Sequence, residues 1–191
     1  HVKDTELLEK MFYIPIELHM PASLCGYIND SDESLHVEGY FPKLAYNGKL
    51  YESGALLCEN LSNSFNCLFH ASMLMESGAM VNFSVDSKAE NDRIKTILNW
   101  GNNTDVTYSG QWATLTRFSK AETDTLALQT DIEILPSTIV LSDSIWNVRA
   151  SHVGIENKRI TIDNFLIERP GQHLRINGNI TDEFTDSCMV D

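Results

Sequence analysis

The chain has few basic residues, and this shortage excludes several classes of partner. Its 191 residues include 14 Lys and Arg against 27 Asp and Glu, which gives a formal net charge of −13. Nucleic-acid binding needs clustered Lys and Arg at the phosphates, and docking on an anionic membrane surface needs the same charges. The acidic residues are dispersed, which is typical of a solvated surface that keeps a protein soluble. We therefore expect no nucleic-acid partner.

Segments that target or anchor a protein are also missing. No apolar run approaches the ~20 residues of a transmembrane helix, and no signal peptide is present. The sequence starts at His1 rather than Met, and it stops at Asp191 inside a strand-like run. We expect the chain to be a fragment, with any targeting element of its parent protein outside it.

Motifs for common catalytic chemistry are absent as well. GxSxG, GxGxxG, P-loop and HExxH patterns do not occur. The six histidines are scattered and form no ligand-like set, so neither a metal site nor a cofactor is expected. Asp30 and Asp32 resemble half of a calcium loop, but the glycine and the distal Glu are lacking, which favours a polar turn. An enzyme is the least favoured class.

Cysteine is scarce, with four residues and no CxxC spacing, which argues against a zinc or thioredoxin-like site. Cys58 and Cys67 flank a predicted hairpin and face each other across its strands. They form either a cross-strand disulfide, if the compartment is oxidising, or two buried thiols that pack as small apolar groups. The sequence leaves both outcomes open.

What the sequence does contain is a long series of alternating apolar and polar residues. One helix is predicted at 4–12, and Pro15 ends it because proline disfavours helix at the preceding residue. Residues 1–22 are expected to form this helix and an extended linker. Residues 23–191 are expected to form a single elongated β domain, truncated at its C-terminus. There, strand units of roughly 10 to 14 residues alternate with turns rich in Gly, Asn, Asp and Ser, including the segment 93–100, which we predict as a strand.

The stretch 159–180 predicts how such strands bend. Phe165 is three positions after Ile162, so a regular strand cannot keep both on one face. We therefore predict a bulge near Asp163 and Asn164, which would bend the strand and raise its twist. Pro170–Gly171 suits the centre of a type II turn. Repeated kinks of this kind would curl one antiparallel sheet around its apolar side.

Two patterns near the C-terminus are shared with a known family. One is I-x-I-x-P-S-x-I-x-L-x-D-S-x-W, which starts at Ile132 and ends at Trp146. The other is I-x-I-x-N-F-x-I from Ile160, followed by Q-x-L-x-I-x-G from Gln172 to Gly178. In these patterns the chain from about Tyr108 onwards resembles the TamB-like branch of the AsmA family, the translocation and assembly module proteins, in its Bacteroidetes members.

The resemblance implies an all-β fold: a curled antiparallel sheet that forms an open, β-taco-like apolar groove, here with one short N-terminal helix. It implies lipid transport in the periplasm of Gram-negative bacteria during outer-membrane biogenesis. The partners would be phospholipid acyl chains and, through the full-length protein, an outer-membrane barrel of the BamA or TamA type. The parent protein would be anchored to the inner membrane outside this fragment.

The candidate groove residues are apolar residues of the C-terminal strands. They are Ile132, Ile134, Ile139, Leu141, Trp146, Val148, Val153, Ile155, Ile160, Ile162, Phe165, Ile167, Leu174, Ile176 and Ile180. Two alternatives remain open: a β-sandwich binding module for a glycan or protein partner, and an assembly scaffold for outer-membrane proteins. Trp100, Trp112 and Trp146 lie in alternating strands, and we predict core burial for them rather than a sugar platform.

Overall fold

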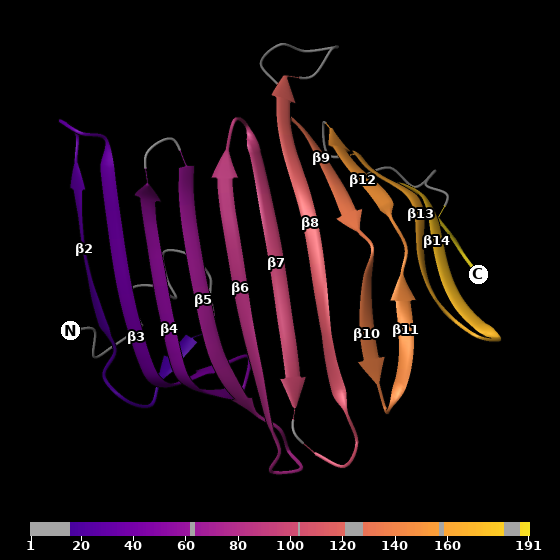
Figure 1. The fold of residues 1–191 in the computed structure, drawn as a ribbon, viewed down its shortest axis with the longest axis horizontal. Coiled ribbons are helices and arrows are strands. Elements are labelled where there is room, and N and C mark those ends of the chain that lie inside the picture. The colour runs from indigo at the N-terminus through magenta and orange to yellow at the C-terminus, as the bar shows by residue number, and fades with distance from the viewer. Residues whose placement is uncertain (1–15, 62–63, 103, 121–127, 157–158, 182–187) are drawn as a thin grey trace. The chain divides into compact units, whose positions relative to one another are not determined.

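The computed structural model describes residues 16–61, 64–102, 104–120, 128–156, 159–181 and 188–191. These residues contain strands and turns and no helix, and the strands belong to one large antiparallel sheet (Figure 1). The prediction of an all-β chain built on a curled antiparallel sheet is confirmed. The helix predicted at 4–12 lies outside the described residues.

The chain divides into two compact units, 1–88 with 98–107 and 89–97 with 108–191, and each is described by itself. A single domain over 23–191 stays a prediction. The strands of the first unit are β1 (Ile16–Leu18), β2 (Ser23–Asn29), β3 (Ser34–Tyr46), β4 (Lys49–Leu61), β5 (Ser64–Leu74) and most of β6 (Met80–Glu90), while β7 (Arg93–Asn102) has residues in both units.

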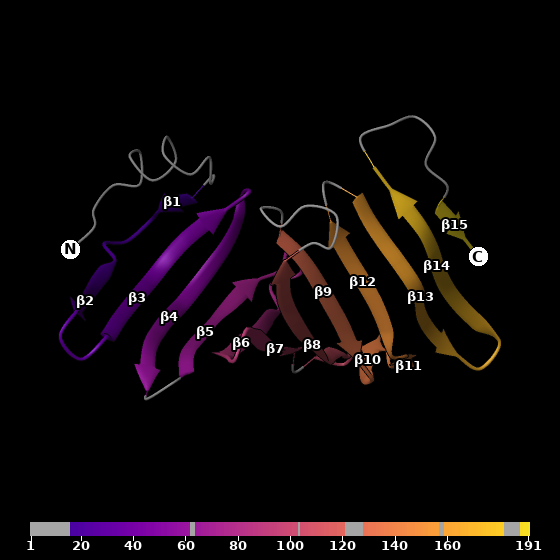
Figure 2. The ribbon, with the colours of Figure 1, turned by 90° about the horizontal axis from the view of Figure 1, so that it is seen from above.

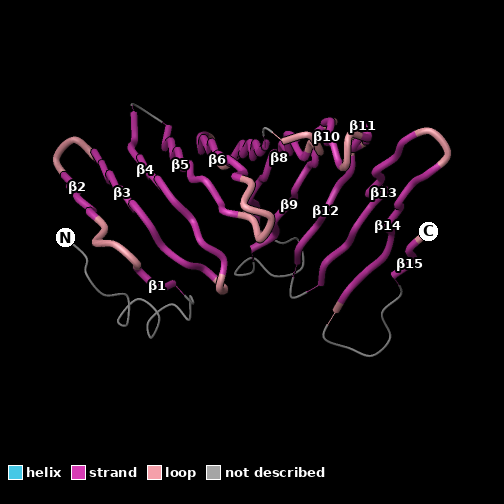
Figure 3. Tube along the Cα trace, turned by 90° about the horizontal axis from the view of Figure 1, so that it is seen from below, coloured by secondary structure: helices cyan, strands magenta, loops and turns pink. Residues whose placement is uncertain are grey.

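The first two strands of the first unit are halves of one interrupted strand, because both pair antiparallel with β3. A loop at 19–21 separates them (Figure 3). Within the expected linker, Ile16–Leu18 is part of the sheet and pairs with Leu44–Tyr46. The remaining pairs follow chain order, from β3 to β4 and from β4 to β5.

The second unit is a meander whose bends break two of its strands. Its strands are β8 (Tyr108–Lys120), β9 (Leu128–Leu135), β10 (Ser137–Leu141), β11 (Ser144–Val148), β12 (Ser151–Glu156), β13 (Arg159–Arg169), β14 (Gln172–Ile180) and β15 (Cys188–Val190). Ile134 pairs with Ser151 and Ser137 pairs with Val148, so β9–β10 and β11–β12 are two long neighbouring strands, each interrupted once. Figure 2 shows the curvature of the strands in each unit.

Several hairpins close with turns that need left-handed backbone. Asn47–Gly48, Asn91–Asp92 and Ser142–Asp143 all have positive φ at both positions, as in type I′ turns, whose twist matches that of paired strands. Gly171 has φ of +76°, the value for the third residue of a type II turn. The predicted turns at these places are confirmed. At the predicted polar turn, the Ser34 N–H donates to Asp32 Oδ1 at 3.1 Å, and hydrogen bonds from Ser34 hold the pKa of Asp32 below its usual range.

Three neighbouring strands of the second unit carry one extra residue at the same level. Ala113 of β8 pairs with Leu135, and Gly110 pairs with Ile139. Between these two pairs the chain advances three positions in β8 but four in β9–β10. The pairing register between β9–β10 and β11–β12 does not change along the two strands, and the register between β11–β12 and β13 does not change either. The extra residue of β9–β10 is therefore matched by one in β11–β12 and one in β13. The register between β13 and β14 does shift, because β14 has no matching extra residue. Each of the three strands between β8 and β14 is thus one residue longer than β8 and β14 over the same stretch.

The third of these extra residues is the predicted bulge. The register shifts between Ile162 and Phe165, and Asn164 has φ of +53°. Its N–H donates to Asn177 Oδ1 at 2.6 Å. The prediction is confirmed, but it concerned one strand only. The two neighbouring strands are interrupted close to this level, at Pro136 and at Arg149–Ala150, so an irregularity occurs in all three strands.

Candidate functional site

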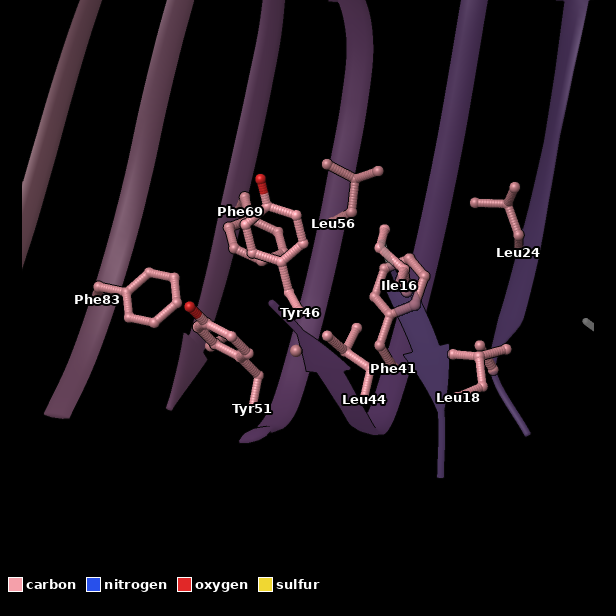
Figure 4. A pocket seen from close by; sticks show the side chains of 13 residues that line it. Ile16, Leu18, Leu24, Phe41, Leu44, Tyr46, Tyr51, Leu56, Phe69 and Phe83 are labelled. Carbon is pink, nitrogen blue, oxygen red and sulfur yellow. The ribbon is translucent and has the colours of Figure 1, made fainter. Parts of the chain in front are cut away.

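An apolar cavity of about 490 Å³ lies in the first unit and is the strongest candidate for a binding site (Figure 4). This volume is in the range of small-molecule pockets, about 300 to 1,000 Å³. None of its lining residues is charged. They are Ile16, Leu18, Ala22, Leu24, Phe41, Leu44, Tyr46, Tyr51, Gly54, Leu56, Phe69, Ala71 and Phe83.

The cavity lies over a transverse irregularity of the first unit. The register between β4 and β5 shifts between Glu52 and Ala55, because Ser53, with φ of +54°, adds a residue to β4. The strand β3 keeps its offset to β4 and therefore carries an extra residue too, beside Pro42. Without these residues, the two halves of each strand would point their apolar side chains to opposite faces.

The interrupted strand β1–β2 is longer still. The eight residues from Ile16 to Ser23 lie opposite the seven from Tyr40 to Tyr46. Compared with β5 over the same stretch, β4 and β3 each contain one extra residue, and β1–β2 contains two. Because bulges bend strands, the halves of β3 and β4 lean around their apolar face. Cavity residues lie on both sides of the bend in each of these three strands.

Aromatic rings form one wall of the cavity (Figure 4). The rings of Tyr51 and Phe83 meet edge to face at 5.7 Å, and those of Phe69 and Phe83 are 6.0 Å apart. Such geometries are favourable for aromatic pairs beyond the area they bury. The ring of Phe41 lies beside Gly39 and Gly54: a Cβ on Gly39 would come within 3.1 Å of that ring. Glycine therefore makes room for it.

The mouth of the cavity is apolar and open. Leu24 is 50% exposed and Tyr46 is 41% exposed, although both line the cavity. Charged groups lie on the other face: Lys43 and Glu52, which form an ion pair of 3.1 Å, alternate with lining residues along their strands. Exposed apolar surface of this kind favours an apolar occupant.

A disulfide lies beyond one end of the cavity. Cys58 pairs with Cys67, and the two are bonded, which decides between the outcomes left open by the sequence. This pair is two residues along from Leu56 and Phe69 and so lies on the same face. Cys25 is a free, exposed thiol.

The predicted groove residues form the apolar face of the second unit. Ile134, Ile139 and Val148 are buried, Leu141, Leu174 and Ile180 are exposed, and the other nine are half-buried. Direct pairs connect them across strands, for example Val153 with Ile132 and with Ile162, and Ile167 with Val148 and with Leu174. The transverse bulge keeps the two halves of this set on one face. Their role as a lipid groove stays a prediction.

The burial predicted for the tryptophans is wrong. Trp100, Trp112 and Trp146 are all half-buried. Trp112 stacks on Phe165 with ring centres 5.8 Å apart, and the guanidinium of Arg169 lies 4.8 Å from the centre of the Trp146 ring. The described strands belong to one sheet, so no second sheet among them covers these rings.

The opposite face of the second unit carries polar groups. His152 Nε2 is 3.2 Å from Asp131 Oδ1, and its Nδ1 is 3.8 Å from Asp163 Oδ2. Arg117 is 3.9 Å from Glu133. Partly exposed pairs like these stabilise a protein little. Over the described part of the chain, no group of three or more His, Cys, Asp and Glu is placed to hold a metal ion.

The residues of the cavity in the first unit were all missed by sequence reasoning, which placed the groove at 132–180. The signal was present in the apolar positions. Phe41 and Leu44 are three apart, as are Tyr51 and Gly54, the same parity change that predicted the bulge near Asn164. Pro42 inside a strand also marks a bulge, because proline cannot donate to the ladder.

No family model, curated protein or solved structure matches the chain. In the described residues there is no helix with the length and hydropathy needed to cross a membrane.

Proposed function

We propose that this chain is part of a TamB-like protein of the AsmA family and that its apolar surfaces hold phospholipid acyl chains. The observation that carries the proposal is the cavity of the first unit, which has no charged lining residue and an open apolar mouth. Acyl chains are apolar, flexible and narrow. They gain free energy on leaving water, and they cover surface that would otherwise be exposed.

Two further observations support this proposal. The described strands form one sheet, and the apolar face of the second unit stays half-exposed, as a lipid-holding surface requires. The disulfide suits an oxidising compartment such as the bacterial periplasm. In the proposed setting the parent protein is anchored to the inner membrane, conducts lipid between the inner and outer membranes and contacts a BamA- or TamA-type barrel. The chain itself performs no catalysis.

The competing functions fit less well. A glycan platform needs tryptophan rings with a free face, but Trp112 is stacked on Phe165 and Trp146 is covered by Arg169. A β-sandwich needs a second sheet, and the described strands belong to one. A scaffold for outer-membrane proteins needs no ligand, so measured binding of an acyl chain separates it from our proposal.

The test is titration of the purified chain with cis-parinaric acid, a fluorescent fatty acid, in wild type and in Leu24→Glu. Leu24 is half-exposed, so its replacement leaves the fold intact, while a carboxylate at the cavity mouth disfavours an acyl chain. We expect wild type to bind and the variant to bind at least about tenfold more weakly.

The matched control is Tyr27→Glu on the same strand. Tyr27 is three residues from Leu24 on a regular stretch of β2, so it lies on the opposite face, and it is 59% exposed. It adds the same charge without entering the cavity. Absence of binding in wild type, or equal weakening by both substitutions, would rule out the cavity as an acyl-chain site.

A further inference from the structure

The second unit has an arginine at the end of its apolar face. Arg169 is the last residue of β13, and strand alternation places it on the same face as Ile167. Its guanidinium covers the Trp146 ring, and its Nε donates to Gln172 Oε1 at 2.7 Å. The contact with the ring and the hydrogen bond hold the guanidinium at this end of the face. The Nη edge has no partner among the described residues.

The neighbouring carboxylate does not neutralise Arg169. Glu168 is the adjacent residue and lies on the opposite face, where its Oε1 accepts a hydrogen bond from Arg149 Nε at 2.6 Å. No salt bridge joins Arg169 to a described carboxylate. Arg169 is therefore a positive charge without an acidic partner among the described residues, at the end of a mainly apolar face, in a chain with net charge −13.

The apolar strip next to Arg169 is long enough for an acyl chain. Val148, Ile167 and Leu174 form the next cross-strand set, and beyond them Phe165 stacks on Trp112. From Arg169 to Ile160 the strand extends about 30 Å at ~3.3 Å per residue. The acyl chains of one leaflet occupy about 15 Å, half of a bilayer's ~30 Å core.

We propose that this end of the second unit binds an anionic amphiphile, with its phosphate on the Nη edge of Arg169 and its acyl chain on the apolar face. A guanidinium is suited to phosphate because its planar fork donates two parallel hydrogen bonds. Arg169 is then the residue that selects for head-group charge. This proposal rests on the proposed function, since it adds a head-group site to an acyl-binding surface.

The test is calorimetric titration with three probes: dodecyl phosphate, the neutral amphiphile dodecyl maltoside, and inorganic phosphate, each amphiphile below its micellar concentration. Wild type should bind dodecyl phosphate more tightly than inorganic phosphate, because only the amphiphile buries an acyl chain. It should also bind dodecyl phosphate at least about tenfold more tightly than dodecyl maltoside, because a hydrogen bond to a charged group has that effect. Arg169→Gln should remove this preference and leave binding of dodecyl maltoside unchanged. Arg169→Lys, which keeps the charge without the planar fork, should retain part of it.

The matched control is Arg175→Gln, in the adjacent strand. Arg175 pairs with Leu166 and alternates with Leu174 and Ile176, so it lies on the opposite face. It should leave all three affinities unchanged. An equal loss in both glutamine variants would mean a general field effect and overturn the site.

The remaining outcomes are equally decisive. Equal affinity of wild type for both amphiphiles overturns the head-group site but leaves the proposed function standing. Inorganic phosphate binding as tightly as dodecyl phosphate would show a phosphate site without an acyl chain, which also overturns it. If neither amphiphile binds, the acyl-binding surface of the second unit fails together with the head-group site.

Discussion

The two units use extra residues in different ways. In the first unit the excess grows from β5 toward the interrupted strand β1–β2, and the cavity lies over the growing bend. In the second unit the excess is one residue in three inner strands, and it returns to zero in β14. The first arrangement accompanies an apolar cavity with an open mouth, and the second accompanies a continuous apolar face.

The comparison shows that length differences between strands, rather than individual side chains, decide where apolar surface is placed. A bulge in one strand alone would set its apolar residues against polar ones of its neighbour. Bulges at the same level in adjacent strands keep the faces aligned and bend all the strands together. The following changes break or sharpen this contrast, from the largest expected effect to the smallest.

Deletion of Asn164 should break the second unit. Without this residue, Phe165 and Ile167 turn to the polar face while β11–β12 keeps its own extra residue. We expect a loss of more than ~3 kcal/mol in the free energy of unfolding, measured by urea denaturation. Asn164→Gly keeps the strand length and tolerates the φ of +53°, so it should cost less than ~1 kcal/mol. A deletion as mild as this substitution would contradict the role of the bulge.

Removing the disulfide should weaken the first unit. Cys58→Ser with Cys67→Ser frees a cross-strand pair nine residues apart, and we expect a loss of about 2 to 3 kcal/mol. The measurement is unfolding by guanidinium, followed by hydrogen exchange to assign the loss to residues of the first unit. Cys25→Ser, which removes the exposed free thiol, should have no effect. Loss of protection in β12 and β13 instead would contradict the division into two units.

Replacing a glycine by alanine should destabilise the protein more in the first unit, at Gly26, than in the second unit, at Gly154. A Cβ on Gly26 in β2 would come within 2.4 Å of the His36 carbonyl oxygen, whereas the nearest atom to a Cβ on Gly154 in β12 is 3.7 Å away. Gly26→Ala should therefore cost about 1 to 3 kcal/mol and Gly154→Ala less than ~0.5 kcal/mol, both by thermal unfolding. The reverse order would show that the register of β2 on β3 is not as described.

The smallest effect is expected at Ser137, next to the break between β9 and β10. Its Oγ is buried and has no hydrogen-bond partner in the structure. Ser137→Ala removes an unsatisfied polar atom and should raise the free energy of unfolding by up to ~1 kcal/mol. A clear destabilisation would mean that this hydroxyl has a partner in solution.

The sequence was sufficient for the strands and for one bulge. Alternation predicted the strands, and Asn-Gly and Pro-Gly marked turns. The bulge near Asn164 was predictable because the apolar residues change from even to odd positions there: Ile160 and Ile162 are followed by Phe165 and Ile167. The same change of parity occurs at Pro136, because Ile134 and Ile139 are five positions apart and a regular strand cannot keep both on one face.

The cavity and the state of the tryptophans depend on relations between distant residues. The excess of β1–β2 over β5 is defined only when the registers of β3 and β4 are known, and no local pattern contains them. The expectation of buried tryptophans rested on the general tendency of large aromatic side chains to be buried in a core. In the described sheet Trp112 is covered by a neighbour on the same face, Phe165, and stays half-buried.

The most direct test of the account is photo-crosslinking from two adjacent positions of β5. Benzoylphenylalanine replaces Phe69, which lines the cavity, or Leu68, which points to the opposite face and is 45% exposed. Each protein is irradiated with phosphatidylcholine vesicles, whose surface carries no net charge, and adducts are measured by mass spectrometry. We predict lipid adducts through the acyl chain at position 69 and few at position 68. Equal labelling at both positions, or labelling at 68 alone, would contradict an acyl-binding cavity.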